Sequence, residues 1–161
     1  MNTLNQTVEL RQYKPEHLKI LREFKLPEAM AQYTAFPAVV LENLTDGQFP
    51  IVILSNNEPV GFFVLHSTDR VQEYTDNLKA MLLTALSINH SEQGKGFAKK
   101  GMNILKSFVN QEFPEYNEIV LAVNHQNIPA QNLYGRVGFS DTGRRKIGRI
   151  GEQFIYSSFV R

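Results

Sequence analysis

The segment LKAMLLTALSINH, residues 78–90, is apolar almost without interruption. A strand with one solvent-exposed face alternates apolar and polar side chains, so an unbroken apolar run is typical of a strand covered on both faces. The segment SEQGKGFAKKGMNIL, residues 91–105, follows directly, and in it Gly94 and Gly96 precede apolar residues at helical spacing. A buried strand that leads at once into a helix predicts an α/β domain built around a central sheet.

Strand and helix patterns alternate along the rest of the chain. The other expected strands are 7–13, 50–55, 59–66, 117–124, 139–147 and 152–160, of which 50–55 and 59–66 form a hairpin. The expected helices are 14–24, 37–47 ending at Gly47, 97–113 as one helix before Pro114, and 127–138 with Asn127 as its cap and Gly138 at its end. No linker or internal repeat divides the chain, so we expect one mixed-sheet α/β domain over residues 1–161.

Composition excludes several classes of protein. The 161 residues carry 17 Lys and Arg against 16 Asp and Glu, a net charge of +1 that is too small for a nucleic-acid binder. No segment approaches the roughly 20 apolar residues that span a bilayer, and the N-terminus lacks the apolar core of a signal peptide. We therefore expect a cytoplasmic protein that has neither nucleic acid nor membrane as a partner.

The chain contains no cysteine, which excludes disulfides, thiolate metal sites and a cysteine nucleophile. The histidines, at His17, His66, His90 and His125, lack the spacing of metal ligands. We therefore predict no metal site.

The turn QGKGFA, residues 93–98, has two interpretations. Glycines at the start of a helix let the backbone approach an anion, and the unpaired N–H groups and the helix dipole attract one. Lys95, Lys99 and Lys100 add positive charge nearby. The alternative is a strand-to-helix turn that only needs permissive backbone. The turn is neither a Walker loop nor a GxGxxG dinucleotide turn, because both spacings are absent.

Two segments resemble the GCN5-related N-acetyltransferase (GNAT) superfamily. Gln93-x-x-Gly96-x-Ala98 matches the Q/R-x-x-G-x-G/A signature of that family, and VNHQNIPAQNLYGRVGF, residues 123–139, is similar to its next block. The residue-specific resemblance covers about 81–139, while the element order resembles the family over the whole chain. It points to the superfamily and to no particular member.

The resemblance implies a three-layer fold with a mixed, mostly antiparallel sheet of about seven strands. Two central parallel strands, 81–89 and 118–124, splay apart, and acetyl-CoA lies between them with its pyrophosphate on the N–H groups of residues 93–98. The cofactor-binding residues it implies are Leu86, Ser87, Ile88, Gln93, Gly94, Lys95, Gly96, Phe97, Ala98, Lys99 and Asn127. Asn127 has a second, compatible interpretation as a helix cap. Dimerisation through the terminal strands is a further implication.

The resemblance also assigns chemistry. Tyr134 falls on the position that in this family commonly protonates the departing CoA thiolate, with a core tyrosine as the alternative. A backbone N–H between Leu86 and Ile88 polarises the acetyl carbonyl. Because the chain has no cysteine, an acetyl-cysteine intermediate is impossible, which favours direct attack by an amine on acetyl-CoA in a ternary complex.

The base that deprotonates the amine is not evident from the sequence. Many relatives carry a carboxylate on the strand before the glycine turn, whereas this strand offers Thr84, Ala85 and Ser87. Water, Glu73, His66 or His125 remain as candidates.

The resemblance implies that the pocket for the acceptor amine is formed by residues 15–45, the loop after the hairpin and the final strand pair. Asp69, Glu73 and Asp76 would attract a cationic amine, whereas Arg144, Arg145, Lys146 and Arg149 would attract an amine that bears a carboxylate. Both groups are also consistent with a solvated surface. For Tyr33, Phe36, Phe62 and Phe63, core packing is favoured over a place in the site.

Three function classes remain open. The first is acetylation of a small-molecule amine, which we favour. The second is acetylation of a protein N-terminus or lysine. The third is a non-catalytic acyl-CoA-binding domain, which the missing carboxylate favours and Tyr134 disfavours.

Overall fold

The computed structural model describes residues 7–160. Seven strands form one sheet in the order β1-β2-β3-β4-β5-β7-β6. The strands are β1 (Val8–Gln12), β2 (Gln48–Ser55), β3 (Glu58–His66), β4 (Ala80–Ile88), β5 (Glu118–Asn124), β6 (Ser140–Gly148) and β7 (Gly151–Phe159). Within the described residues, only β4 and β5 pair in parallel, and the other strand pairs are antiparallel. The predicted mixed, mostly antiparallel sheet is confirmed.

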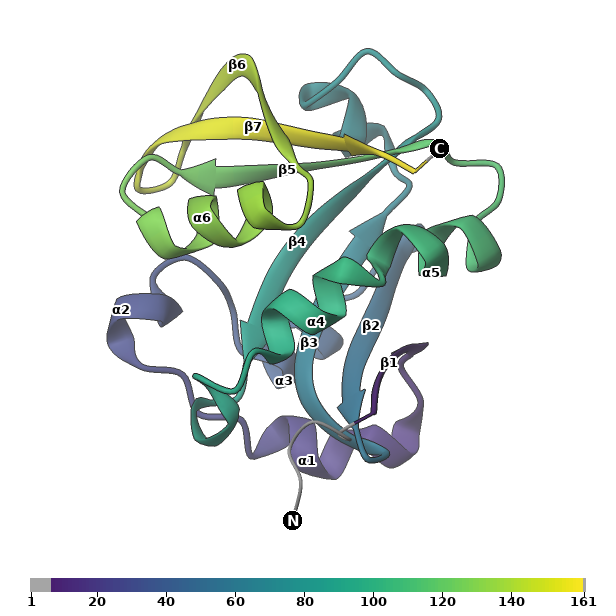
Figure 1. The fold of residues 1–161 in the computed structure, drawn as a ribbon, viewed down its shortest axis with the longest axis vertical. Coiled ribbons are helices and arrows are strands. Elements are labelled where there is room, and N and C mark those ends of the chain that lie inside the picture. The colour runs from purple at the N-terminus through teal and green to yellow at the C-terminus, as the bar shows by residue number, and fades with distance from the viewer. Residues whose placement is uncertain (1–6, 161) are drawn as a thin grey trace.

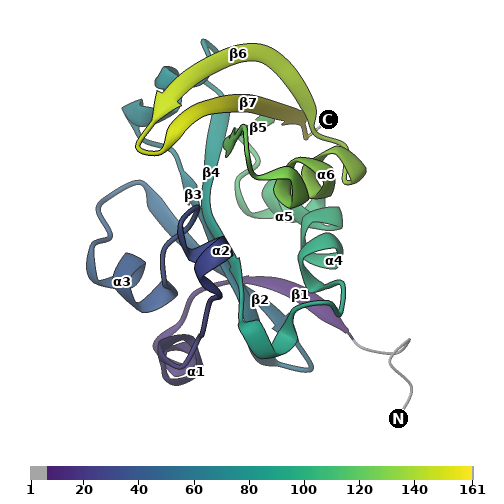
Figure 2. The same cartoon turned by 90° about the vertical axis from the view of Figure 1, so that its left-hand side faces the viewer.

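Helices cover both faces of this sheet. They are α1 (Leu18–Arg22), α2 (Glu28–Ala31), α3 (Pro37–Glu42), α4 (Phe97–Asn103), α5 (Leu105–Glu112) and α6 (Ile128–Arg136), with short 3-10 helices at Pro15–His17, Asp69–Glu73 and His90–Glu92. Figures 1 and 2 show α1 to α3 on one side of the sheet and α4 to α6 on the other. The three-layer arrangement is therefore as predicted. Within residues 7–160, no helix has the length and apolar character to cross a bilayer.

The core lies on both sides of the central strands, which explains their continuous apolar sequence. Phe63 packs with Phe97 and Leu105 beneath α4 and α5, while its neighbour Phe62 packs with Leu21 beneath α1. Phe62 and Phe63 are fully buried, so the preference for core packing over a site role is confirmed for both. Successive residues of one strand thus supply two separate apolar layers.

Two predicted helix boundaries are wrong. The helix that begins at Pro37 ends at Glu42, and Gly47, with φ +81°, instead forms the turn that leads into β2. The single helix expected over 97–113 is divided at Ile104, which has φ −101° and whose N–H bonds the carbonyl of Gly101. An i→i−3 bond tightens the last turn of a helix, so α4 ends there and α5 begins one residue later.

The parallel pair β4–β5 is joined at one end only. Pairing covers Ala80–Glu118, Met81–Ile119 and Leu82–Val120 and then stops, although both strands continue. The predicted splay between the two parallel strands is confirmed. At the joined end, the buried carboxylate of Glu118 accepts hydrogen bonds from Asn77 Nδ2 at 3.0 Å and from Ser157 Oγ, which ties it to both neighbouring segments.

A bulge in β4 accompanies the divergence. Phe62 pairs with Ser87 and Val64 with Thr84, so two residues of β4 stand opposite one residue of β3. One of the two, Ala85, has φ +59°, a left-handed conformation that is rare for a residue with a side chain. A bulge bends its strand and leaves backbone groups without a partner in the ladder. It therefore turns the second half of β4 away from β5.

Candidate active site between β4 and β5

A cleft of about 760 Å³ lies where β4 and β5 diverge. The second halves of both strands form two of its walls, at residues 83–88 and 121–124. The start of α6, the segment around α2 and the turn between β6 and β7 complete it. Gln93 and Ala98, around the start of α4, also line it, so segments from six parts of the chain meet where β4 and β5 separate.

The β4 wall contains three of the predicted cofactor residues, Leu86, Ser87 and Ile88, and all of them line the cleft. Ser87 is buried, and its hydroxyl has no hydrogen-bond partner among the described residues. The side chain of Gln93 donates to the carbonyl of Ile88 at 2.9 Å, which fastens the glycine turn to the end of this strand. Gln93 thus continues the edge of the cleft that the second half of β4 begins.

The glycine turn has the backbone that the sequence predicts. Gly94 and Gly96 have φ +79° and +82°, and a side chain at either position would meet no atom of the described chain within 4 Å. The glycines are therefore required by their backbone conformation and not by crowding within the protein. Gly96 is the N-terminal cap residue of α4, so the N–H groups of the first turn lie directly beyond it.

The other predicted residues of the turn lie in different environments. Gln93 and Ala98 line the cleft, whereas Gly94, Lys95, Gly96, Phe97 and Lys99 do not. Phe97 is buried in the core beneath α4, so only its backbone is free for a ligand. Lys95 forms an exposed ion pair with Glu92 at 3.0 Å, which reduces the positive charge it offers, while Lys99 is exposed.

Two predicted residues come from the α6 side of the cleft. The side chain of Asn127 accepts a hydrogen bond from the N–H of Ala130 at 3.3 Å, so its predicted role as a helix cap is confirmed, and it also lines the cleft. Tyr134 lines the cleft and is 6% exposed, with its ring packed edge-on against Phe139. Burial raises the pKa of the Tyr134 phenol above its ordinary value, so the hydroxyl stays protonated and able to donate a proton.

Of the candidate bases, one is connected to the cleft. His66 is 3% exposed, and its Nε2 lies 2.6 Å from Oγ1 of Thr84, which lines the cleft. Glu73 is instead paired with Lys146 at 2.9 Å on the surface, and neither Glu73 nor His125 lines the cleft. Burial and the positive charge of Arg70 lower the pKa of His66 to about 4, so its ring is neutral at neutral pH.

This buried histidine predicts a pH-dependent stability. The unfolded chain binds a proton at His66 near pH 6.5, whereas the folded protein binds it only near pH 4. The free energy of unfolding should therefore fall by roughly 3 kcal/mol as the pH drops from 6.5 to 4. Below pH 4, His66 is protonated in both states and causes no further loss. Urea unfolding of wild type and His66→Gln at pH 7 and pH 4.5 measures the effect.

The difference in the loss of stability between wild type and His66→Gln isolates the contribution of His66. Burial also lowers the pKa of His17, but His17 is present in both proteins. Glutamine keeps a polar side chain beside Thr84 but does not titrate. An equal loss of stability in wild type and His66→Gln contradicts the assignment. The exposed His90→Gln variant serves as the control and should follow wild type.

The acceptor end combines the segment around α2 with the β6–β7 turn. Residues 26–34 and 149–153 contribute to the lining, whereas the loop after the hairpin, residues 67–79, does not, contrary to the expectation. Arg149 Nη2 donates to the carbonyl of Gln32 at 3.2 Å, which joins the two segments. Of the remaining aromatic residues, Tyr33 lines the cleft, while Phe36 is exposed outside it, so core packing is wrong for both.

The charged residues near the final strands form pairs with one another. The pairs are Arg144–Asp76 at 3.8 Å, Arg145–Asp141 at 2.8 Å and Lys146–Glu73 at 2.9 Å. None of these six side chains lines the cleft, and neither does Asp69. Arg149 is the one member of the two predicted charge groups that reaches the site.

Two residues of the cleft, Thr84 and Asn124, have no role in the sequence-based prediction. Asn124 is buried at the end of β5, where its side chain donates to the carbonyl of Ile150 at 3.3 Å and accepts from the N–H of Gln126 at 2.9 Å. It thereby fixes the β6–β7 turn against the cleft. The available signal was a polar residue within an otherwise apolar strand. Over residues 7–160, no group of three His, Cys, Asp or Glu side chains is placed to hold a metal ion.

A sheet that opens between two parallel strands, beside a glycine turn and a buried tyrosine, is the arrangement that the resemblance to the GNAT superfamily implies. The model of the Acetyltransferase (GNAT) family matches residues 13–139 of this sequence. The chain therefore belongs to the GNAT family and is an acetyl-CoA-dependent N-acetyltransferase. The resemblance on residues 93–98 and 123–139 is confirmed.

Individual relatives agree with this assignment. The protein named Uncharacterized N-acetyltransferase YbbJ from Bacillus subtilis (strain 168) is 45% identical over 160 residues, covering 98% of this chain and 100% of that protein. The structure of the aminoglycoside acetyltransferase AAC(6')-Ib with coenzyme A and kanamycin superposes with a TM-score of 0.74 at 18% identity and covers 95% of each chain. The spermidine N-acetyltransferase from Vibrio cholerae with CoA and spermine gives 0.70 at 16% identity, over 94% of this chain and 95% of that one. At such identities the two structures support the fold.

Proposed function

We propose that this protein transfers the acetyl group of acetyl-CoA to the primary amine of a small molecule, by direct attack of the amine within a ternary complex. The observation that carries the proposal is the cleft between the diverging halves of β4 and β5, with Tyr134 buried in its wall. Neither strand pairs with the other there, so backbone groups of the bulged strand are available to a bound molecule.

The glycine turn and the cleft together fit the two ends of acetyl-CoA. The N–H groups at the start of α4, with Gly94 and Gly96 open to solvent, suit the diphosphate, and the exposed Lys99 adds a positive charge. The pantetheine arm then follows the edge formed by Gln93 and residues 86–88, with Asn127 on the opposite wall. Coenzyme A accompanies two of the similar structures, AAC(6')-Ib and the Vibrio enzyme.

The residues around the thioester provide the steps of the transfer. A backbone N–H of residues 86–88 stabilises the negative charge that develops on the carbonyl oxygen as the amine nitrogen bonds to the carbonyl carbon. The C–S bond then breaks, and Tyr134 gives its proton to the thiolate of CoA. The proton lost by the amine leaves through Thr84, its neighbour His66 or water, and proton exchange with solvent restores the phenol.

The similar structures favour a small molecule over a protein segment as the acceptor. Two of the structures with this fold carry small amines, kanamycin and spermine, in their complexes.

Two measurements test the proposal. Calorimetry with acetyl-CoA should give binding in the micromolar range, and release of CoA thiol should occur with members of a panel of small amines. Turnover with peptides alone would replace the proposal by peptide or lysine acetylation. Binding of acetyl-CoA without turnover on either panel would indicate an acyl-CoA-binding domain, and an absence of binding would contradict all three functions.

A further inference from the structure

The acceptor end of the cleft is positively charged. Among the described residues that line the cleft there is no Asp, Glu, Lys or His, and Arg149 supplies the single formal charge. We propose that the acceptor is a small amine that also bears a carboxylate, with an apolar side chain, and that Arg149 binds the carboxylate. This inference rests on the proposed function and names its substrate class.

A polyamine acceptor does not suit this lining. Only one nitrogen of such a molecule reacts, and every other ammonium group would enter the cleft without a carboxylate to pair with. Removing a charge from water without a partner is costly. The acidic side chains on the surrounding segments, Glu28 and Glu152, lie outside the lining. Glu73, Asp76 and Asp141 also lie outside it and are paired with cations.

Arg149 differs from the other cations of the final strands. Arg144, Arg145 and Lys146 each pair with a carboxylate, whereas Arg149 donates from Nη2 to the carbonyl of Gln32. A guanidinium carries five N–H donors in a planar fork, so most of them remain for a ligand. The fork matches the two oxygens of a carboxylate and binds them through parallel hydrogen bonds.

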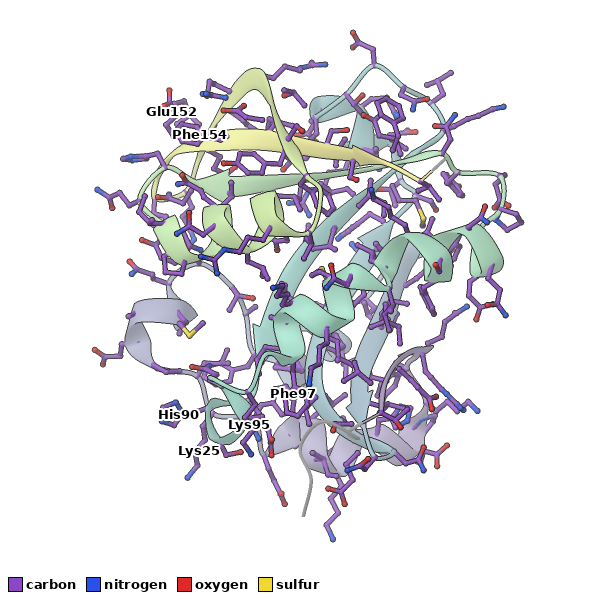
Figure 3. The ribbon with its side chains drawn as sticks, in the orientation of Figure 1. Lys25, His90, Lys95, Phe97, Glu152 and Phe154 are labelled. Atoms are coloured by element: carbon purple, nitrogen blue, oxygen red, sulfur yellow. The ribbon has the colours of Figure 1, made fainter. Side chains whose placement is uncertain are left out.

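The position of Arg149 separates it from the cofactor's diphosphate. The guanidinium belongs to the β6–β7 turn and contacts the segment after α2. Figure 3 shows Glu152 and Phe154, which follow this turn, at one end of the molecule, and Lys95 and Phe97 of the glycine turn toward the other. Arg149 and the glycine turn thus belong to separate parts of the molecule, so one molecule of acetyl-CoA does not require both.

Apolar side chains surround the same end. Leu26, Ala29, Met30 and Tyr33 line it from the side of α2, and Ile150 lines it from the turn next to Arg149. Met30 and Ile150 are 43% and 39% exposed, which is large for apolar residues and leaves their surface available to a ligand. A carboxylate beside an apolar body is the chemistry of an amino acid with an apolar side chain.

The test compares amino acids with their amides, and each rate is referred to the fraction of neutral amine, because amidation also lowers the pKa of the amine. We expect kcat/KM for leucine and phenylalanine to exceed that for leucinamide and phenylalaninamide by about 10-fold or more, with spermidine the poorest substrate. Arg149→Gln should lower kcat/KM for leucine by about 10- to 100-fold, since hydrogen bonds to charged groups have such an effect on binding. It should leave leucinamide, and the KM for acetyl-CoA, nearly unchanged.

The control is Arg144→Gln, which removes a cation from the same hairpin that does not line the cleft. It should leave all the acceptors as they are in wild type. The inference would be overturned by equal rates with leucine and leucinamide, or by a preference for spermidine. It would also be overturned if Arg149→Gln lowered kcat/KM equally for leucine and leucinamide, which would assign Arg149 to holding Gln32 in place. In each of these cases acetyl-CoA still turns over, so the proposed function survives, whereas it fails if acetyl-CoA does not bind.

Discussion

Replacing Tyr134 with phenylalanine should lower kcat by about 10²-fold or more and leave the KM for acetyl-CoA nearly unchanged. Proton donation to a leaving group contributes roughly 10²–10⁴-fold to a rate, and phenylalanine keeps the ring while removing the donor. Because the ring packs against Phe139 within the core cluster, the fold should tolerate the change. Steady-state kinetics of CoA release, together with a melting curve for each protein, measures both effects.

Tyr74→Phe provides the matched control, because Tyr74 is buried to the same degree, 5% exposed against 6%, but lies outside the cleft. Its kcat should equal that of wild type. A kcat for Tyr134→Phe within a few-fold of wild type would show that the phenol is not the acid and is there to fill the core.

The pH profile gives an independent test of the same proton. Burial raises the pKa of Tyr134 above the ordinary value near 10, so the acid stays protonated throughout the alkaline range in which the amine loses its own proton. The kcat of wild type should therefore not decline between pH 8 and about 10. A decline in that range would mean that the phenol ionises there and that its surroundings are more polar than the structure indicates.

The sequence predicted the framework of the fold because the framework depends on local pattern. The unbroken apolar run at 78–90 identifies β4, since a strand covered on both faces has no polar face to display. Asn127 and Gly138 identify the limits of the last helix through capping and left-handed backbone. Each of these features depends only on residues that are close to it in the sequence.

The features that failed depend on contacts across the fold. Gly47 ends no helix because the chain turns there into β2, beside Thr68 of a distant loop. The interaction of Lys146 with Glu73 joins residues 73 positions apart, so the opposed charges of the acceptor region could be resolved only in three dimensions. The same holds for His66 and Thr84, which adjacent antiparallel strands bring together. Site residues that act through such pairs cannot be identified from the local sequence pattern.

Replacing Gly96 with valine should weaken the binding of acetyl-CoA by about 10- to 100-fold. The turn depends on a left-handed residue at this position, with φ +82°, directly before the first N–H groups of α4. A β-branched side chain strongly disfavours that conformation, so the backbone moves and the amides no longer converge on the diphosphate. The expected range corresponds to the loss of about one hydrogen bond to a charged group. Calorimetric titration with acetyl-CoA measures it directly.

The matched control is Gly143→Val, because Gly143 has nearly the same conformation, φ +85°, and also has open space around it, but lies in β6 outside the cleft. Both variants carry the same backbone strain of roughly 1–2 kcal/mol and should lose similar stability. Only Gly96→Val should lose affinity for acetyl-CoA. Equal affinities in the two variants would mean that the amides of residues 93–98 do not hold the diphosphate, and that Gly96 is there only because the turn from β4 into α4 needs it.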